Sequence, residues 1–145
     1  MNYTRFILAL SVGAFSVAEV QAGIREAVLS RSARRGSMTS TEHHLVHGAN
    51  PNKLVFNKTP LMRAVKYGNE GAVEALLKHN ANVDTFNRKD RSALSYAAIY
   101  NRSDFAEKIL ERAMVLNVRA KILSKRDRDG NTPLHLALLY GSQDI

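Results

Sequence analysis

The sequence lacks several features on which common functions depend. It contains no cysteine, which excludes disulfides, thiolate zinc sites and a cysteine nucleophile. Its eight glycines are scattered, so there is no glycine-rich loop of the kind that cradles a phosphate. We therefore expect no cofactor and no enzymatic activity within these 145 residues.

Acidic residues are scarce relative to basic ones. The chain has 13 Asp and Glu against 21 Lys and Arg, which gives a net charge of +8. This balance favours an acidic protein, a nucleic acid or an anionic membrane surface as partner, and a solvated basic surface without a partner is the alternative. Basic pairs such as Arg34-Arg35 and Lys125-Arg126 are too short for a nucleic-acid tract. The sequence therefore favours a protein partner over a nucleic acid.

Residues 1–22 have the pattern of a secretory signal peptide. Arg5 precedes a 13-residue apolar run from Phe6 to Ala18, and small residues around Val20 and Ala22 offer a cleavage site. The run is too short for a transmembrane helix, which needs about 20 residues, so we expect no stable membrane anchor. The pattern predicts cleavage after Ala22 and export to the periplasm, the medium or a host.

A self-similar unit organises the rest of the chain. The stretch Thr132-Pro133-Leu134 is similar in sequence to Thr59-Pro60-Leu61 and, more weakly, to Ser92-Ala93-Leu94. The spacing is 33 residues from Thr59 to Ser92 and 40 from Ser92 to Thr132. A period near 33 residues is typical of a solenoid.

The repeat pattern is clear in the second unit and degenerate in the first. Residues 53–84 predict one helix from Pro60 to Tyr67, a turn at Gly68-Asn69 and a second helix that ends near His79. An offset of 32 aligns residues 23–52 with this unit, and there we expect helices near 25–35 and 39–47 with a turn at Gly36. We interpret 23–52 as a degenerate capping repeat, with a disordered linker as the alternative.

The last two units depart from the period. In residues 85–124, Asn101 replaces Gly68, and the extra residues predict a second helix about two turns longer, or else a longer loop. Residues 125–145 form a partial unit that leaves Leu134, Ala137 and Leu138 without part of the face they should pack on. A fragment, a shortened reading frame or a contact with a partner would each account for this open face.

These motifs resemble those of ankyrin-repeat proteins. The match is carried by the run Asp127-Arg128-Asp129-Gly130-Asn131-Thr132-Pro133-Leu134-His135-Leu136-Ala137 and by Asn80-Ala81-Asn82-Val83-Asp84. The resemblance implies an all-α solenoid of helix-turn-helix pairs with connecting β-hairpin fingers. It also implies binding of other proteins along a concave side made by the finger tips and first helices, without catalysis.

Carrying the family's binding positions over one by one gives a set of cations and aromatic residues. The predicted protein-binding residues are Phe56, Lys58, Arg63, Lys66, Tyr67, Phe86, Arg88, Lys89, Arg91, Tyr96, Tyr100 and Arg128. Tyr and Arg are enriched at interface hot spots, so we expect a protein partner with an acidic patch. The alternative is that these cations only solvate the fingers and that some rings belong to the core.

The sequence leaves two alternative functions open. One is that the chain is the targeting segment of a longer exported protein or effector, and the other is that it is a basic binder of anionic surfaces or nucleic acid. His43 and His47 share a helix face, but no nearby set of ligands completes a metal site, so we predict none. We expect His135 to make a structural hydrogen bond.

Overall fold

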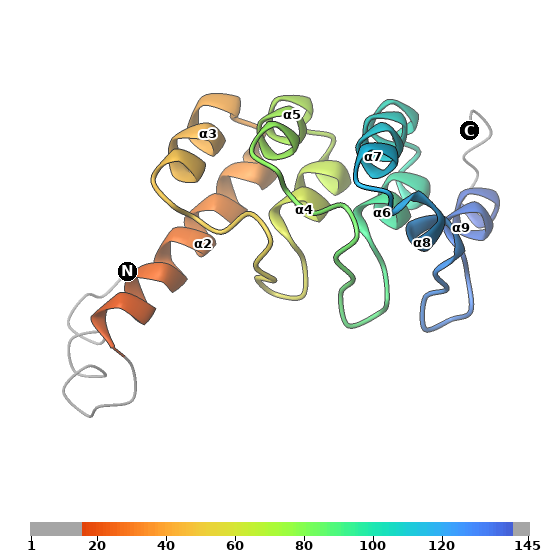
Figure 1. Cartoon of the computed structure of the whole chain (residues 1–145), viewed down its shortest axis with the longest axis horizontal. Coiled ribbons are helices and arrows are strands. Elements are labelled where there is room, and N and C mark those ends of the chain that lie inside the picture. Colours follow the sequence, from red (N-terminus) through yellow and green to blue (C-terminus); the bar gives the residue numbers. More distant parts are fainter. Residues whose placement is uncertain (1–15, 141–145) are drawn as a thin grey trace.

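The computed structural model describes residues 16–140, and over this range all regular structure is helical, as predicted (Figure 1). The first-helix row consists of α2 (Val17–Arg35), α4 (Pro60–Tyr67), α6 (Ala93–Ile99) and α9 (Pro133–Leu139). The second-helix row consists of α3 (Met38–Val46), α5 (Glu70–Lys78) and α7 (Ser103–Val115). A short helix, α8 (Arg119–Ser124), precedes the last finger.

Local sequence signals set the helix ends. The side chains of Thr59, Ser92 and Thr132 each accept a hydrogen bond from the backbone N–H three residues on, which caps α4, α6 and α9. Gly68 ends α4 at φ 72°, and Asn101 takes the same left-handed conformation at φ 53°. The predicted turns after the first helices are therefore present.

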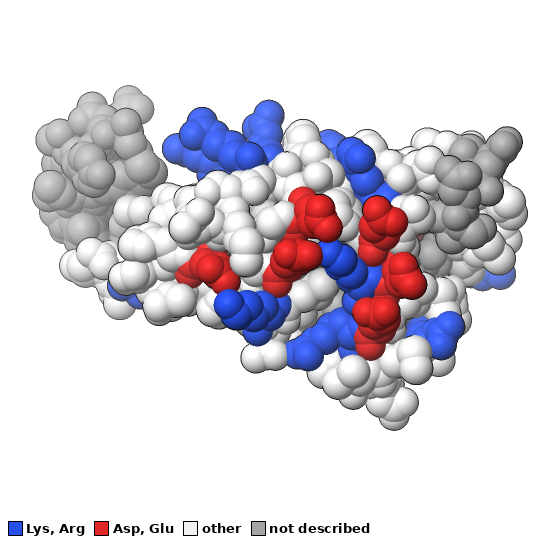
Figure 2. Space-filling model, turned by 90° about the horizontal axis from the view of Figure 1, so that it is seen from above, with Lys and Arg blue, Asp and Glu red and all other residues white. Residues whose placement is uncertain are grey.

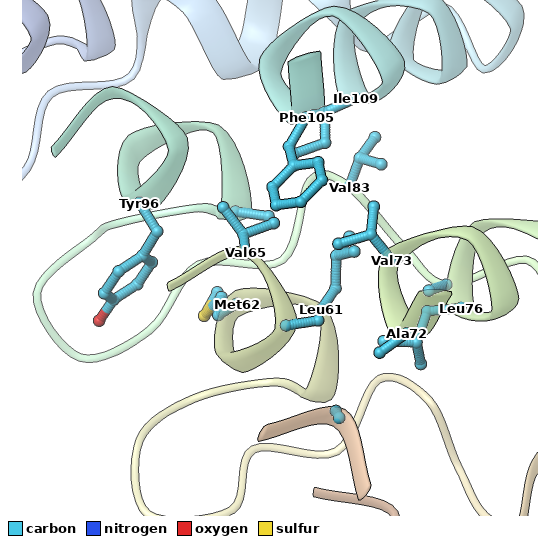
Figure 3. Close-up of a cluster of buried hydrophobic side chains, with 14 of the residues drawn as sticks. Leu61, Met62, Val65, Ala72, Val73, Leu76, Val83, Tyr96, Phe105 and Ile109 are labelled. Atoms are coloured by element: carbon cyan, nitrogen blue, oxygen red, sulfur yellow. The ribbon is translucent and has the colours of Figure 1, made fainter. Parts of the chain in front are cut away.

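The core lies between successive helix pairs. Leu61 and Val65 of α4 are fully buried, and they lie among Val73 and Leu76 of α5 and Ile109 of α7 (Figure 3). Each pair thus covers the apolar face of the one before it, which is how repeat arrays gain stability. The helices predicted near 25–35 and 39–47 correspond to α2 and α3, and Leu29 and Leu45 join the same core.

The third helix pair corrects one expectation. With 13 residues, α7 is longer than the 9-residue α5, so the predicted lengthening is present, but it amounts to about one turn and not two. The helix ends at Val115, and Asn117 follows with φ 57°. The chain turns there and forms α8, which places Ile122, fully buried, in the core. The separate helix α8 thus places Ile122 in the core, whereas a straight extension of α7 would place this residue away from the core.

The fingers are hairpin turns without strands in the described part of the chain. Val55 and Lys58 form an isolated β-bridge, with the Val55 N–H donating to the Lys58 carbonyl at 2.9 Å. In the later fingers, the Asn87 N–H donates to Arg91 O at 3.0 Å and the Asp127 N–H to Asn131 O at 2.8 Å. The predicted β-hairpin fingers are therefore hairpin-like in their turns, but they lack extended strands.

Neighbouring fingers are tied by an ion pair. Arg91 Nε donates to Asp127 Oδ2 at 2.9 Å, and Arg91 Nη2 donates to Asp129 Oδ2 at 3.3 Å. Asp127 is buried and also accepts backbone N–H groups from Asp129 and Asn131. Burial alone would raise the pKa of Asp127, but hydrogen bonds from Asn131 and Arg91 and the Arg91 charge bring it below its ordinary value of 3.8.

The last helix has an uncovered face. Leu61 and Val65 are 0% exposed, whereas Leu134 and Leu138, at the same repeat positions, are 64% and 73% exposed. The expected open face is therefore present at these two leucines, but Ala137 is buried against α6. The predicted closure at Gly141 lies outside the described residues.

The first prediction concerns the turn after α4. Replacing Gly68 by Ala should lower the free energy of unfolding by about 1–2 kcal/mol, because a side chain disfavours left-handed backbone. A Cβ at Gly68 would also come within 2.8 Å of the Arg102 guanidinium carbon. The control is Gly23→Ala, which meets no atom within 4 Å and lies in α2. Denaturant unfolding of both variants tests this, and equal stabilities would contradict it.

The second prediction concerns the buried ion pair. Asp127→Asn should cost about 3 kcal/mol of unfolding free energy at pH 7, because it leaves the largely buried Arg91 with only the exposed carboxylate of Asp129 as a charged partner. A lowered carboxylate pKa stabilises the folded state above the unfolded-state pKa, so this contribution is lost as pH falls through the folded-state pKa. The difference from wild type should therefore shrink in acid.

Unfolding curves at neutral and acidic pH measure the effect. The matched control is Asp129→Asn, which removes an exposed partner of the same arginine and should cost less than about 1 kcal/mol. A loss for Asp127→Asn that does not change with pH would show that the charge of Asp127 is not what stabilises the fingers.

Candidate protein-binding surface

The two helix rows carry opposite charge. The second-helix row holds six acidic and three basic residues: Glu42, Glu70, Glu74, Asp104, Glu107 and Glu111 against Lys78, Lys108 and Arg112. The first-helix row holds six basic and two acidic residues: Arg25, Arg31, Arg34, Arg35, Arg63 and Lys66 against Glu19 and Glu26. The positive charge of the helices is therefore concentrated in the first-helix row.

Two of the three cations of the second-helix row are paired with acids of the neighbouring unit, and the third, Arg112, donates to Asn80 Oδ1. Lys78 lies 3.0 Å from Glu42, and Lys108 lies 3.2 Å from Glu70 and 2.7 Å from Glu74. A hydrogen bond to Glu74 raises the pKa of Lys108, as expected for an ammonium with acidic neighbours. Figure 2, a view onto this row, shows red and blue side chains next to one another.

Cations of the first-helix row lack such partners. Within the described residues, no carboxylate oxygen lies within 4.0 Å of the charged nitrogens of Lys58, Arg63 or Lys66. Burial lowers the pKa of Lys58, and the charges of Lys66 and Arg63 lower it further. Burial also lowers the pKa of Arg63. These pKa shifts show that the cations are partly desolvated and repel one another.

Aromatic rings lie between these cations. Lys66 Nζ is 5.3 Å from the ring centroid of Tyr67 and 5.8 Å from that of Tyr100, while the Arg34 guanidinium is 5.1 Å from Tyr67. The rings of Tyr96 and Tyr100 stack at 6.4 Å with an interplanar angle of 8°. Cation–π contacts of this kind hold the charged groups in place on α2, α4 and α6.

Five of the twelve predicted residues come together on this side, and Arg34 joins them. We call the group Arg34, Lys58, Arg63, Lys66, Tyr67 and Tyr100 the cationic-aromatic face. The other predicted residues lie along the fingers. Phe56, Arg88, Lys89 and Arg128 are exposed, whereas Phe86 is half-buried with Lys121 and Lys125 near its ring.

Two predicted residues are corrected by their packing. Tyr96 is only 7% exposed, and its hydroxyl accepts a hydrogen bond from Asn87 Nδ2 at 3.0 Å, so its ring belongs mainly to the core (Figure 3). Burial raises the pKa of this tyrosine. Arg91 is held by the buried carboxylate of Asp127, so it is not a free surface cation. Both residues position the fingers and helices around the face.

Arg31 and Arg34 were not among the predicted residues. The offset of 32 that aligns Leu29 with Leu61 also aligns Arg31 with Arg63 and Arg34 with Lys66. The offset of 32 therefore indicates these two arginines, but the interpretation of the first helix as the polar outer face of a capping repeat assigns no binding residue to it. In the structure this helix extends the row of cations by one unit.

The remaining candidates do not form a chemical site. His43 and His47 share a helix face, with ring centroids 4.2 Å apart, but no group of three metal-ligating side chains occurs over residues 16–140. The prediction for His135 is confirmed, since its Nδ1 lies 2.6 Å from the Thr132 hydroxyl. In the part of the chain that the structure describes, none of the helices is long and apolar enough to span a bilayer.

Known families match most of the chain. Residues 29–120 match a family model described as ankyrin repeats (3 copies), and residues 129–145 match one described as ankyrin repeat. The two matched segments include all the helices of both rows except the first turns of α2.

Curated relatives match through the same region. A candidate E3 ubiquitin-protein ligase from Arabidopsis thaliana, XBAT31, is 36% identical over 122 residues, which are 78% of this chain and 26% of that protein. The human transient receptor potential cation channel subfamily A member 1 is 31% identical over 87 residues, 60% of this chain and 7% of the channel. The ARF GTPase-activating protein Git of Drosophila melanogaster is 33% identical over 96 residues, 62% of this chain and 13% of that protein. The chain thus spans about a quarter or less of each relative.

Proposed function

The chain belongs to the ankyrin-repeat family, and on this premise we propose that it is an exported protein–protein interaction module whose partner has an acidic surface. Ankyrin repeats mediate protein–protein interaction, and the observation that carries the finer proposal is the unpaired charge of the cationic-aromatic face. Lys58, Arg63 and Lys66 have no carboxylate partner, whereas Lys78 and Lys108 of the second-helix row do.

The face suits acidic protein surfaces for two physical reasons. Carboxylates of a partner would make charge-assisted hydrogen bonds to cations that are already partly desolvated, so little further desolvation is needed. Tyr67 and Tyr100 offer apolar area next to the charges, a combination enriched at interface hot spots. The charge also steers an acidic partner during encounter.

The relatives suggest one alternative. The chain spans about a quarter or less of each relative described above. The alternative proposal is therefore that the same interaction module is the targeting segment of a longer exported protein or effector. The activities that the relatives' names describe belong to those proteins and are not assigned to this chain.

Export rests on the apolar run at residues 6–18, which lies mostly outside the described residues. One structural observation is compatible with processing there. The buried residues of α2 begin at Glu26, so cleavage after Ala22 removes none of them, although α2 runs through this position. The fold of the repeats therefore does not depend on residues 16–22 for its core.

The third prediction tests the acidic partner. Lys66→Glu should slow association with that partner about tenfold at low salt, because electrostatic steering sets the rate of encounter. Lys78→Glu makes the same change of charge in the second helix of the same unit and should have little effect. Proteins captured by the full chain, identified by mass spectrometry, supply the partner, and surface-bound kinetics at several salt concentrations measure the rate.

Two outcomes would contradict the proposal. Equal slowing by both substitutions would indicate that only the net charge matters. An association rate independent of salt and unaffected by Lys66→Glu would show that the cationic-aromatic face takes no part in binding.

The fourth prediction tests export. Protein recovered from fractions of the producing cell should begin at Gly23, because the signal pattern places the cut after Ala22. N-terminal sequencing identifies the first residue, and a lysine introduced in the apolar run, Leu8→Lys, should block processing. Full-length protein confined to the cytoplasm would contradict export.

A further inference from the structure

A hollow opens between α2 and the first finger, next to the cationic-aromatic face. Its walls come from one face of α2, from the tip of the finger and from α4, and the lining residues are Ala27, Ser30, Arg31, Arg34, Val55, Phe56 and Arg63. Three arginines thus line one small depression, and its other lining side chains are short or apolar. No acidic residue lines it.

Two of these arginines are held in position. Arg63 Nη2 donates to the Val55 carbonyl at 2.7 Å, which ties the guanidinium to the finger, while its buried Nε has no hydrogen-bond partner. Arg34 stacks over the ring of Tyr67 at 5.1 Å. A guanidinium that is already placed loses less side-chain entropy when it binds an anion.

The three charges are not neutralised by the protein. Within residues 16–140, no carboxylate lies within 4.0 Å of the guanidinium nitrogens of Arg31, Arg34 or Arg63. The carboxylate of Glu26, on the same helix as Arg31 and Arg34, accepts the Asn50 N–H and does not line the hollow. An anion that entered would therefore meet arginines that have no carboxylate partner.

An aromatic ring stands at the rim. Phe56 is 87% exposed and adopts φ 49°, followed by Asn57 at φ 63°. A bulky residue at positive φ is disfavoured, and the surrounding turn holds it through the Val55–Lys58 bridge and through Asn57 Oδ1, which accepts the Arg88 N–H at 2.8 Å. The turn keeps the phenyl ring next to the arginines and exposed to solvent.

We propose that this hollow binds the phosphate group of a phosphorylated side chain on the partner, and that Phe56 packs against the carrier of that phosphate. The inference rests on the proposed function, since it assigns a subsite within the same binding surface. A phosphate carries close to two negative charges and three acceptor oxygens at pH 7, whereas a carboxylate offers one charge and two oxygens. Three arginines that line one hollow match the phosphate better.

The fifth prediction uses small probes on the full chain. Phenyl phosphate and benzoate share a ring and differ in the anion, and the Arg Nε–H signals in proton–nitrogen spectra report binding at each guanidinium. We expect phenyl phosphate to bind at least about tenfold more tightly than benzoate, because each lost charge-assisted contact is a factor of about ten in affinity.

Variants separate this site from general surface charge. Arg34→Gln should weaken phenyl phosphate about tenfold, whereas Arg35→Gln, which makes the same charge change at the adjacent exposed position of α2, should leave affinity unchanged. Phe56→Ala should weaken phenyl phosphate but leave inorganic phosphate unaffected. Circular dichroism of each variant verifies that the helices are retained.

Several results would overturn the assignment. Benzoate binding as tightly as phenyl phosphate, equal losses for Arg34→Gln and Arg35→Gln, or tighter binding of a short single-stranded oligonucleotide through the same arginines would each do so. If no probe binds while Lys66→Glu still slows the acidic partner, the phosphate subsite fails and the proposed function stands. If phenyl phosphate binds as expected while Lys66→Glu changes nothing, the proposed function fails instead.

Discussion

Burial of each helix pair against the next is the constraint on which the rest of this structure depends. Leu61 and Val65 of α4 are covered by the following pair, while Leu134 and Leu138 at the same repeat positions are largely exposed. Whether the side chain at a given repeat position is buried or exposed therefore depends on whether a following helix pair packs against it. The stability of the array is accordingly close to a sum over adjacent units.

Stacking in register also determines where charge accumulates. Because consecutive units superpose, residues 32 or 33 positions apart lie side by side, and Arg31 and Arg34 of α2 continue the line of Arg63 and Lys66 of α4. Cations that recur in the sequence thus line the same hollow on adjacent helices. Tyrosine rings between the cations separate them and provide apolar contact area.

The two rows differ in the pairing of their cations as well as in the number of cations. Lys78 and Lys108 are neutralised by glutamates of the preceding unit, and Arg91 by an aspartate of the following finger. Lys58 and Arg63 have no such partner and are partly buried, so an anion from outside can bind them with little competition from the protein's own acids. The excess of basic over acidic residues in the first-helix row is thus available to a partner.

The period, the helical class, the turns at Gly68 and Asn101, and the helix caps at Thr59, Ser92 and Thr132 could be predicted from the sequence, since they follow from residues close together in the chain. Which cations are free depends on contacts between distant residues. Arg91 and Arg63 look alike in the sequence, but one meets a carboxylate 36 residues away and the other meets a backbone carbonyl. The burial of Tyr96 and the break after Val115 depend on packing in the same way, because local propensity does not encode what lies beside a residue in space.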